Sequence, residues 1–174
     1  MTENVRIAIL GAGNIGTSIA RGLAGGRNFT PDRITLARRR LHLLDDFRAR
    51  GFAVTNDNLA AVRSADVIII SVEPQVVDSL LEEIAPELDF DRHIVISVVT
   101  GLSIRRIEEL TGRPMRIARA MPNTAIAVGE SMTCIASNGP DDKALDMARL
   151  IFNDVGKTLR IREEDMIAAT ALGA

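Results

Sequence analysis

The sequence predicts an α/β protein of the Rossmann type, with a doubly wound and mostly parallel sheet. Apolar, β-branched runs recur along its 174 residues and alternate with segments of helical spacing. The central runs, at 67–72 and 94–99, are almost continuously apolar, as is typical of strands buried on both faces. A glycine-rich motif at 11–16 separates the first such run from a helical segment. The length allows one domain whose core needs no disulfide.

The elements follow one another in a regular order. Strands are expected at 5–10, 33–37, 52–54, 67–72, 94–99, 116–121, 131–137 and 158–162. The last two flank a helix and are expected to extend the sheet edge. Three apolar stripes with helical spacing predict amphipathic helices. They comprise Ile15, Ile19, Ala20 and Leu23, then Val77, Leu80, Leu81 and Ile84, then Leu145, Ala148, Phe152 and Val155.

The last segment, EEDMIAATALGA at 163–174, begins like a helix with an acidic first turn and ends on apolar residues. We therefore expect a dinucleotide-binding domain over 1–162 and, over 163–174, the start of a helix leading to a domain that this sequence does not contain. The apolar end is expected to be exposed without that partner.

The composition excludes several classes of function. A net charge of −2 offers no case for binding nucleic acid or an anionic membrane. The N-terminus lacks the pattern of a signal peptide, and the longest apolar runs are strand-sized. The single cysteine, Cys134, permits no internal disulfide and fits a cytoplasmic location. With only His42 and His93 beside it, a structural zinc site is not expected.

These side chains have simpler interpretations. Cys134 is expected to be an inert buried thiol, and both histidines are interpreted as surface or packing residues. The acidic pairs Asp141–Asp142 and Glu163–Glu164 are interpreted as helix-start residues rather than metal ligands.

The motif GAGNIG supplies glycines where a dinucleotide site needs them. Gly11 permits a tight turn, Gly13 lets the backbone approach a pyrophosphate, and Gly16 lets helix and strand pack closely. The pyrophosphate would then lie at the positive end of the helix. The alternative is a glycine-rich turn that binds nothing; the strand before it and the helix after it favour the nucleotide.

The end of the second strand indicates which dinucleotide is bound. An NAD-specific site places Asp or Glu there to hold the ribose hydroxyls. Here Ala37 is followed by Arg38, Arg39 and Arg40, and guanidinium groups match a 2′-phosphate in charge and geometry. NADP(H) is therefore favoured and NAD(H) remains possible. The alternative is a solvated charge run at a loop.

Further stretches resemble a known family. SVEPQ (71–75), SVVTGLSI (97–104), RAMPNTAIAVGESMT (119–133) and the terminal segment, together with GAGNIG, resemble the pyrroline-5-carboxylate reductase family along essentially the whole chain. The resemblance implies reduction of the C=N bond of 1-pyrroline-5-carboxylate to L-proline by NAD(P)H. It also implies a small-molecule substrate, no metal, and a C-terminal all-helical domain that makes a homodimer or larger oligomer.

The resemblance also implies which residues form the site. The residues expected at the cofactor are Gly11, Gly13, Asn14, Ile15, Gly16, Ala37, Arg38, Arg39, Asn58, Ser71, Val72, Glu73 and Pro74. Those expected to form the floor of the substrate pocket are Met121, Pro122, Asn123 and Thr124. The catalytic side chains stay unidentified; because a cyclic imine can bind already protonated, a sequence poor in acids and bases at these positions agrees with such a reaction.

Three departures from the family pattern bear on function. Glu73 stands where the family usually has Lys, and Ala125 where it commonly has Pro. The helical domain, which supplies hydroxyl groups for the substrate carboxylate, would begin just after Ala174. Two other hypotheses therefore stay open: a related NADP-dependent imine or hydroxyacid oxidoreductase, and a dinucleotide-binding module without catalysis.

Overall fold

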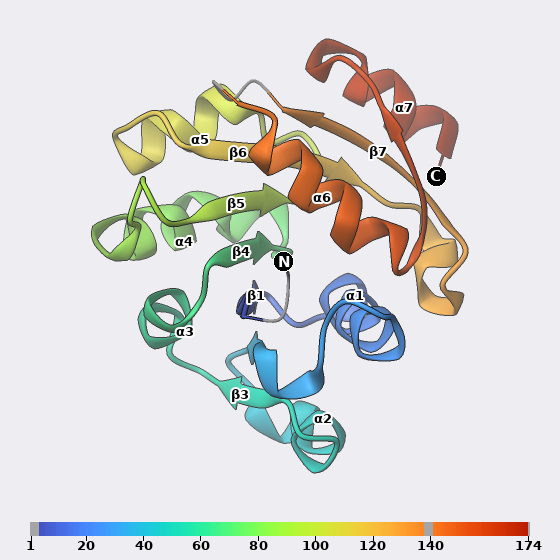
Figure 1. Cartoon of the computed structure of the whole chain (residues 1–174). Helices are drawn as coiled ribbons and strands as arrows, with labels where there is room; N and C mark the ends of the chain where they lie inside the picture. Colours follow the sequence, from blue (N-terminus) through green and yellow to red (C-terminus); the bar gives the residue numbers. More distant parts are fainter. Residues whose placement is uncertain (1–3, 138–140, 174) are drawn as a thin grey trace.

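The computed structural model describes residues 4–137 and 141–173 and contains one eight-stranded sheet (Figure 1). The strands are β1 (Ile7–Leu10), β2 (Ile34–Ala37), β3 (Ala53–Thr55), β4 (Val67–Ile70), β5 (Ile94–Ser97), β6 (Arg116–Met121), β7 (Ser131–Ser137) and β8 (Gly156–Arg160). The α-helices are α1 (Asn14–Gly25), α2 (Asp45–Ala49), α3 (Asn58–Ser64), α4 (Val77–Ile84), α5 (Ile104–Thr111), α6 (Lys143–Asn153) and α7 (Met166–Gly173). The predicted fold class and all eight strands are confirmed, with ends that differ by a few residues.

The strand order, β3-β2-β1-β4-β5-β6-β7-β8, reverses direction between β1 and β4. Strands β1 to β6 are parallel, so their carboxyl ends meet at one edge. In such sheets ligands bind at this edge, where the order reverses. The last two strands extend the sheet as expected, but β7 runs antiparallel to β6 and β8 runs parallel to β7.

Helices cover both faces of the sheet because strand side chains alternate in direction. Ile7 and Ile9 of β1 belong to a core with α1, α2 and α6, whereas Ala8 and Leu10 belong to a second core with α3, α4 and α5. The stripes predicted on α4 and α6 are buried. The stripe on α1 is buried except for Ile15, whose side chain is 42% exposed.

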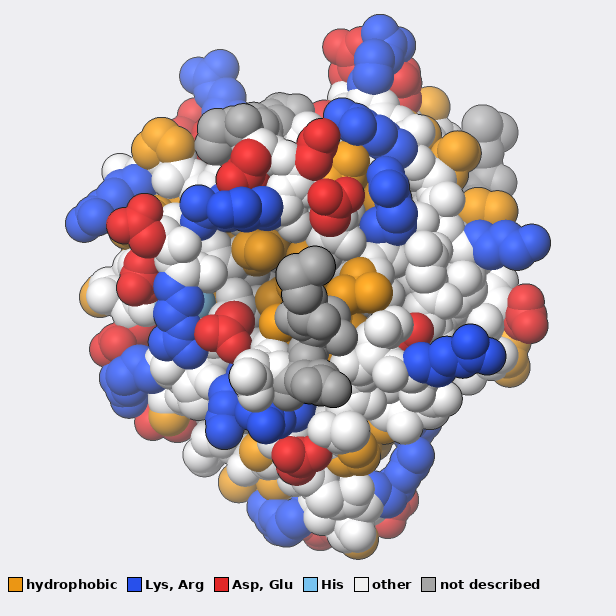
Figure 2. Space-filling view, viewed as in Figure 1, with side chains coloured by type: hydrophobic (Ala, Val, Ile, Leu, Met, Phe, Trp, Pro, Cys, Tyr) orange, Lys and Arg blue, Asp and Glu red, His pale blue; other side chains and the backbone are white. Residues whose placement is uncertain are grey.

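Charged side chains of both signs are intermingled over the face seen in Figure 2. On that face, neither sign of charge forms a large separate patch. In the part of the chain that the structure describes, no helix has the length and apolar character needed to cross a membrane.

The two histidines differ in environment. His42 is exposed, whereas His93 is 1% exposed and lies between the amide of Asp89, which donates to Nδ1 at 2.9 Å, and the carbonyl of Ala65, 3.1 Å from Nε2. Burial, helped by the nearby charge of Arg92, lowers the pKa of His93. The folded protein therefore holds this imidazole neutral.

This burial predicts a pH dependence of stability. Because the pKa of His93 is lower in the folded than in the unfolded chain, the unfolded chain binds more protons as pH falls below about 6.5. The free energy of unfolding is expected to decrease over that range by at most about 1.4 kcal/mol per pH unit. Urea unfolding curves recorded at several pH values between 7.5 and 5.0 measure this decrease in the free energy of unfolding. His93→Gln should flatten this part of the profile and His42→Gln should not; equal slopes in all three proteins would contradict the prediction.

Candidate functional site

The glycine-rich loop connects β1 to α1 at the carboxyl edge of the sheet. The amides of Gly11 and Ala12 both donate to the carbonyl of Ala37, at 3.1 and 3.0 Å, which ties the loop to the end of β2. The hydroxyl of Ser71, just beyond β4, donates to the carbonyl of Gly11 at 2.8 Å. Two neighbouring strands thus fix the loop from both sides.

The three glycines of the motif are required for different reasons. Gly11 has φ +92°, and a Cβ there would lie 2.6 Å from Val72 Cγ1. A Cβ on Gly16 would lie 2.7 Å from Ser71 Oγ. At both positions, neighbouring protein atoms therefore leave no room for a side chain. A Cβ on Gly13 would meet nothing nearer than the Gly11 carbonyl oxygen at 4.0 Å, so the space beside Gly13 is open to a ligand.

The N-terminus of α1 is suited to an anion. Gly13 is its N-cap and no side-chain hydrogen bond caps the helix, whose first turn contains no acidic residue. The first amides of a helix lack partners within the helix, and its dipole places positive charge there. Asn14 and Ile15, the first two helical residues, are exposed at this end.

The arginines beyond β2 lie beside this loop. Nη1 of Arg38 donates to the carbonyl of Ala12 at 3.1 Å, so its guanidinium lies next to the glycine-rich loop. Arg39 and Arg40 are exposed. Within the described ranges no carboxylate forms an ion pair with these three side chains.

The other expected cofactor residues lie at the same edge. Ser71 and Val72 contact the glycine-rich loop, as described above, and Glu73 and Pro74 follow them on the exposed surface. The carboxylate of Glu73 accepts from Gln75 at 2.8 Å. Asn58 begins α3, but its side-chain amide donates to the Glu83 carboxylate, at 3.2 Å to Oε2, so its nearest recorded partner is on α4.

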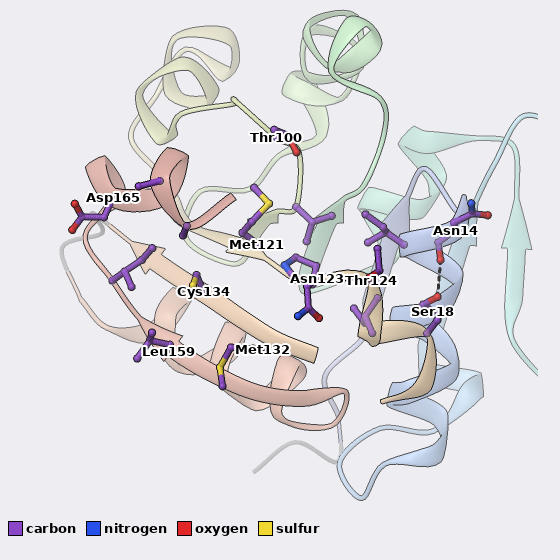
Figure 3. Close-up of a pocket in the computed structure, with 18 residues that line it drawn as sticks. Asn14, Ser18, Thr100, Met121, Asn123, Thr124, Met132, Cys134, Leu159 and Asp165 are labelled. Carbon is purple, nitrogen blue, oxygen red and sulfur yellow. Dashed lines mark hydrogen bonds between the residues drawn. The ribbon is translucent and has the colours of Figure 1, made fainter. Parts of the chain in front are cut away.

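A cavity of about 690 Å³ extends from the N-terminus of α1 across the ends of β6, β7 and β8 to α7 (Figure 3). In Figure 3, Asn14 and Ser18 of α1 lie on one side and Asp165, just before α7, on the opposite side, with Met121 and Asn123 between them. The cavity is lined by Asn14, Ile15, Ser18, Val98, Thr100, Met121, Pro122, Asn123, Thr124, Ile126, Ala127, Met132, Cys134, Leu159, Ile161, Asp165, Ala168 and Ala169. All four residues predicted for the pocket floor are among them.

Asn123 has an unusual place in this lining. Its amide nitrogen in the backbone donates to Ser131 Oγ at 3.2 Å, which holds the loop after β6. Its side-chain oxygen is buried and has no hydrogen-bond partner among the described residues. A buried acceptor without a partner is costly, and a ligand that donates a hydrogen bond would satisfy it.

Cys134 corrects one expectation. It is part-exposed rather than fully buried, and it lines the cavity from β7, where it pairs in register with Met121 of β6. Burial raises the pKa of this thiol, so it is mostly protonated at neutral pH and a weak nucleophile. The expectation of an unreactive thiol thus agrees with the structure, although its position differs.

Glu163 lies at a helix start, as expected, and also makes long-range contacts. It lies in the 3₁₀ turn η6 (Glu163–Asp165) before α7, and its carboxylate points into the protein. Oε1 accepts from the backbone amide of Ile104 at 2.7 Å and lies 3.4 Å from Nη1 of Arg119 on β6. No group of three or more His, Cys, Asp or Glu side chains in the described ranges could hold a metal.

Sequence reasoning missed the far wall of the cavity. Ile161, Ala168 and Ala169 line it from α7 and the segment before it, and Met132 and Leu159 line it from β7 and β8. The alternation along β7 could have indicated Met132 and Cys134 as residues of one face. Nothing in the sequence showed which face α7 covers.

Comparisons with known proteins relate the chain to a family of oxidoreductases. Residues 6–101 match the family described as NADP oxidoreductase coenzyme F420-dependent. Pyrroline-5-carboxylate reductase 2 of Dictyostelium discoideum is 41% identical over 191 residues, which cover 99% of this chain and 62% of that protein. The chain spans less than two thirds of the length of the curated relatives it matches.

Solved structures of pyrroline carboxylate reductases are also similar to this chain. The pyrroline-5-carboxylate reductase of Coxiella burnetii superposes with a TM-score of 0.91 and 32% identity, over 99% of this chain and 64% of that one. The pyrroline carboxylate reductase of Plasmodium falciparum, solved with NADP bound, gives a TM-score of 0.88 and 27% identity, over 99% and 63%. The resemblance that the motifs predicted is confirmed, and the chain belongs to the family described as NADP oxidoreductase coenzyme F420-dependent.

Proposed function

We propose that the chain is the cofactor-binding part of an enzyme that reduces 1-pyrroline-5-carboxylate to L-proline with NADPH. The observation that carries the proposal is the single cavity that joins the N-terminus of α1 to the loop of Met121–Thr124. A cofactor bound along this edge and a substrate at the loop would share one space. The names of the relatives support this choice of substrate.

The residues at the edge fit a dinucleotide. The open space beside Gly13 admits a pyrophosphate, and the uncapped end of α1 offers it amide donors. Arg38, whose guanidinium lies beside the loop, and the exposed Arg39 after it offer cations that would suit a 2′-phosphate. Bound NADPH would supply the hydride; the protein's part is to bind it, orient it and exclude water.

The cavity suits a protonated cyclic imine. Its described lining is mostly apolar and contains one charged side chain, Asp165, whose carboxylate is held by Arg162 at 2.9 Å. A protonated imine has one N–H donor, and the unpartnered oxygen of Asn123 is an acceptor of the kind it needs. Because such a substrate arrives with its proton, the reaction does not require a general acid from this lining.

We propose the same division of the chain as the sequence suggested: residues 1–162 bind the dinucleotide, and residues 163–174 begin a helix that leads to a helical, oligomer-forming domain. A homo-oligomer in the cytoplasm is part of this proposal. The greater length of the relatives favours the proposed division of the chain.

The test is an assay of the full-length protein with 1-pyrroline-5-carboxylate, in which oxidation of the reduced nicotinamide is followed by absorbance. Production of proline supports the proposal. Reduction of other imines or oxidation of hydroxyacids without any turnover of this substrate would favour the related oxidoreductases. Cofactor binding without turnover of any of them would favour the non-catalytic module.

We further propose that NADPH binds more tightly than NADH. One guanidinium–phosphate contact is typically worth about 1.5–3 kcal/mol, so the two dissociation constants are expected to differ by roughly tenfold or more. Arg38→Ala should narrow this difference, whereas Arg149→Ala, on the exposed face of α6, should leave it unchanged. Titration followed by nicotinamide fluorescence measures both; equal affinities of the parent for the two cofactors would refute the proposal.

A further inference from the structure

A buried ion pair links the segment before α7 to the middle of the sheet. Arg119 of β6 and Glu163 of η6 have side chains that are only 7% and 17% exposed. The Glu163 oxygen that faces Arg119 Nη1 at 3.4 Å also accepts from the amide of Ile104, the first residue of α5, at 2.7 Å. One carboxylate thus joins β6, α5 and the segment that leads into α7.

The ion pair and the cavity floor lie on the same face of the sheet. Arg119 and Met121 are two residues apart on β6, so their side chains point to the same side. In register with them on β7 are Ala136, opposite Arg119, and Cys134, opposite Met121. The ion pair is therefore two residues along β6 from Met121 in the cavity floor.

Helix α7 needs such a connection to keep its place. Its sequence contains no charged residue, and of its first two side chains Met166 is buried while Ile167 is 76% exposed. The next two, Ala168 and Ala169, line the cavity with short side chains that bury little area. The apolar contacts of Ala168 and Ala169 have no preferred direction, whereas the hydrogen bonds of Glu163 are directional and fix the segment that leads into the helix.

We infer that Arg119 and Glu163 are positioning residues that hold α7 as the far wall of the cavity. The consequence for imine binding rests on the proposed function, but the placement of α7 does not. Removal of the pair should let α7 move away from β7 while the sheet and the glycine-rich loop keep their structure. The cavity would then lose Ala168 and Ala169 from its lining.

The only cysteine of the chain reports on this wall directly. Cys134 is part-exposed and shares the cavity with Ala168 and Ala169, so its reaction with a maleimide at pH 8 depends on how often α7 moves away. Glu163→Ala, which removes the hydrogen bonds to Ile104 and Arg119, is expected to accelerate labelling about tenfold. Glu163→Gln keeps an acceptor for Ile104 and should give an intermediate rate.

Arg119→Met tests the other partner with a side chain of similar length. Its matched control is Arg116→Met on the same strand, because Arg116 pairs with Asp141 rather than with Glu163. The first should accelerate labelling and the second should not. If Arg119→Met unfolds, as its circular dichroism melt would reveal, Glu163→Ala decides, since Glu163 lies outside the sheet.

A second measurement links the wall to function. In the full-length protein, Glu163→Ala should raise KM for the imine more than KM for NADPH, and Glu163→Gln should recover part of the loss. Labelling rates equal to that of the parent in folded Glu163→Ala and Arg119→Met would overturn the inference. Failure of the parent to reduce the imine would refute the proposed function alone, because the labelling result is independent of it.

Discussion

Gly13→Val is expected to abolish NADPH binding while the sheet stays folded. The position can accept a side chain, because a Cβ there would lie 4.0 Å from its nearest neighbour, the Gly11 carbonyl oxygen. The same side chain would fill the space through which the pyrophosphate reaches the first amides of α1. Losing two or more charge-assisted hydrogen bonds predicts a dissociation constant at least about 100-fold higher.

Two variants make this result specific. Gly25→Val, in the last turn of α1, adds the same side chain where nothing lies within 4 Å, and should bind NADPH normally. Gly16→Val would place its Cβ 2.7 Å from Ser71 Oγ and should lower the melting temperature itself. The measurements are cofactor titration and circular dichroism melts. Native-like Gly13→Val protein that binds NADPH within twofold of the parent would mean that the motif is only a turn.

The 174-residue chain is expected to bind NADPH and yet reduce 1-pyrroline-5-carboxylate far more slowly than the full-length protein. The substrate carries a carboxylate, and the one charged side chain in the described lining, Asp165, has the same sign of charge. Without a group that fixes the substrate, the contribution of orientation is lost, and this can be worth roughly 7–11 kcal/mol of the barrier. The expected loss of turnover is therefore on the order of 10⁵-fold or more.

The comparison is made with the two proteins side by side, at saturating NADPH, with proline measured as product. Light scattering on the same samples reports their masses. Cofactor affinity should agree within a few-fold, which shows that the shorter protein is folded. Turnover by the shorter chain at a rate close to that of the full-length protein would mean that the additional length serves assembly only.

Local patterns were sufficient to predict the sheet, because the strands at its centre are apolar segments that can be recognised one by one in the sequence. The glycine-rich loop could also be predicted. Its contacts with the residues after β4 exclude a side chain at Gly11 and Gly16, so the constraint is visible in the sequence as glycine at both positions. The exposure of Ile15 could not be predicted from the stripe on α1. The apolar period places Ile15 near the buried face, but the first turn of α1 extends beyond the sheet and into the cavity.

The positions of Cys134 and Glu163 depended on long-range pairing. Cys134 faces the cavity because β7 pairs with β6 in the register that sets it opposite Met121; a shift by one residue would have turned it into the core. Glu163 resembles an ordinary helix-start residue until the fold brings Arg119 beside it, 44 positions earlier in the chain. Such partners are set by topology rather than by local sequence.

The antiparallel direction of β7 has a consequence for how this architecture can diversify. Because β6 ends and β7 begins at the same edge, the connection that contains Asn123 and the 3₁₀ turn η5 (Thr124–Val128) leaves and re-enters the sheet at neighbouring points. Surface connections between fixed ends tolerate insertion, deletion and substitution better than the strands they join. This connection borders the cavity, whereas the glycine-rich loop is held separately by β2 and β4. Mutation can therefore reshape the floor of the cavity, where we propose that the substrate binds, and leave the proposed dinucleotide site intact, so that new substrate preferences could evolve on an inherited cofactor site.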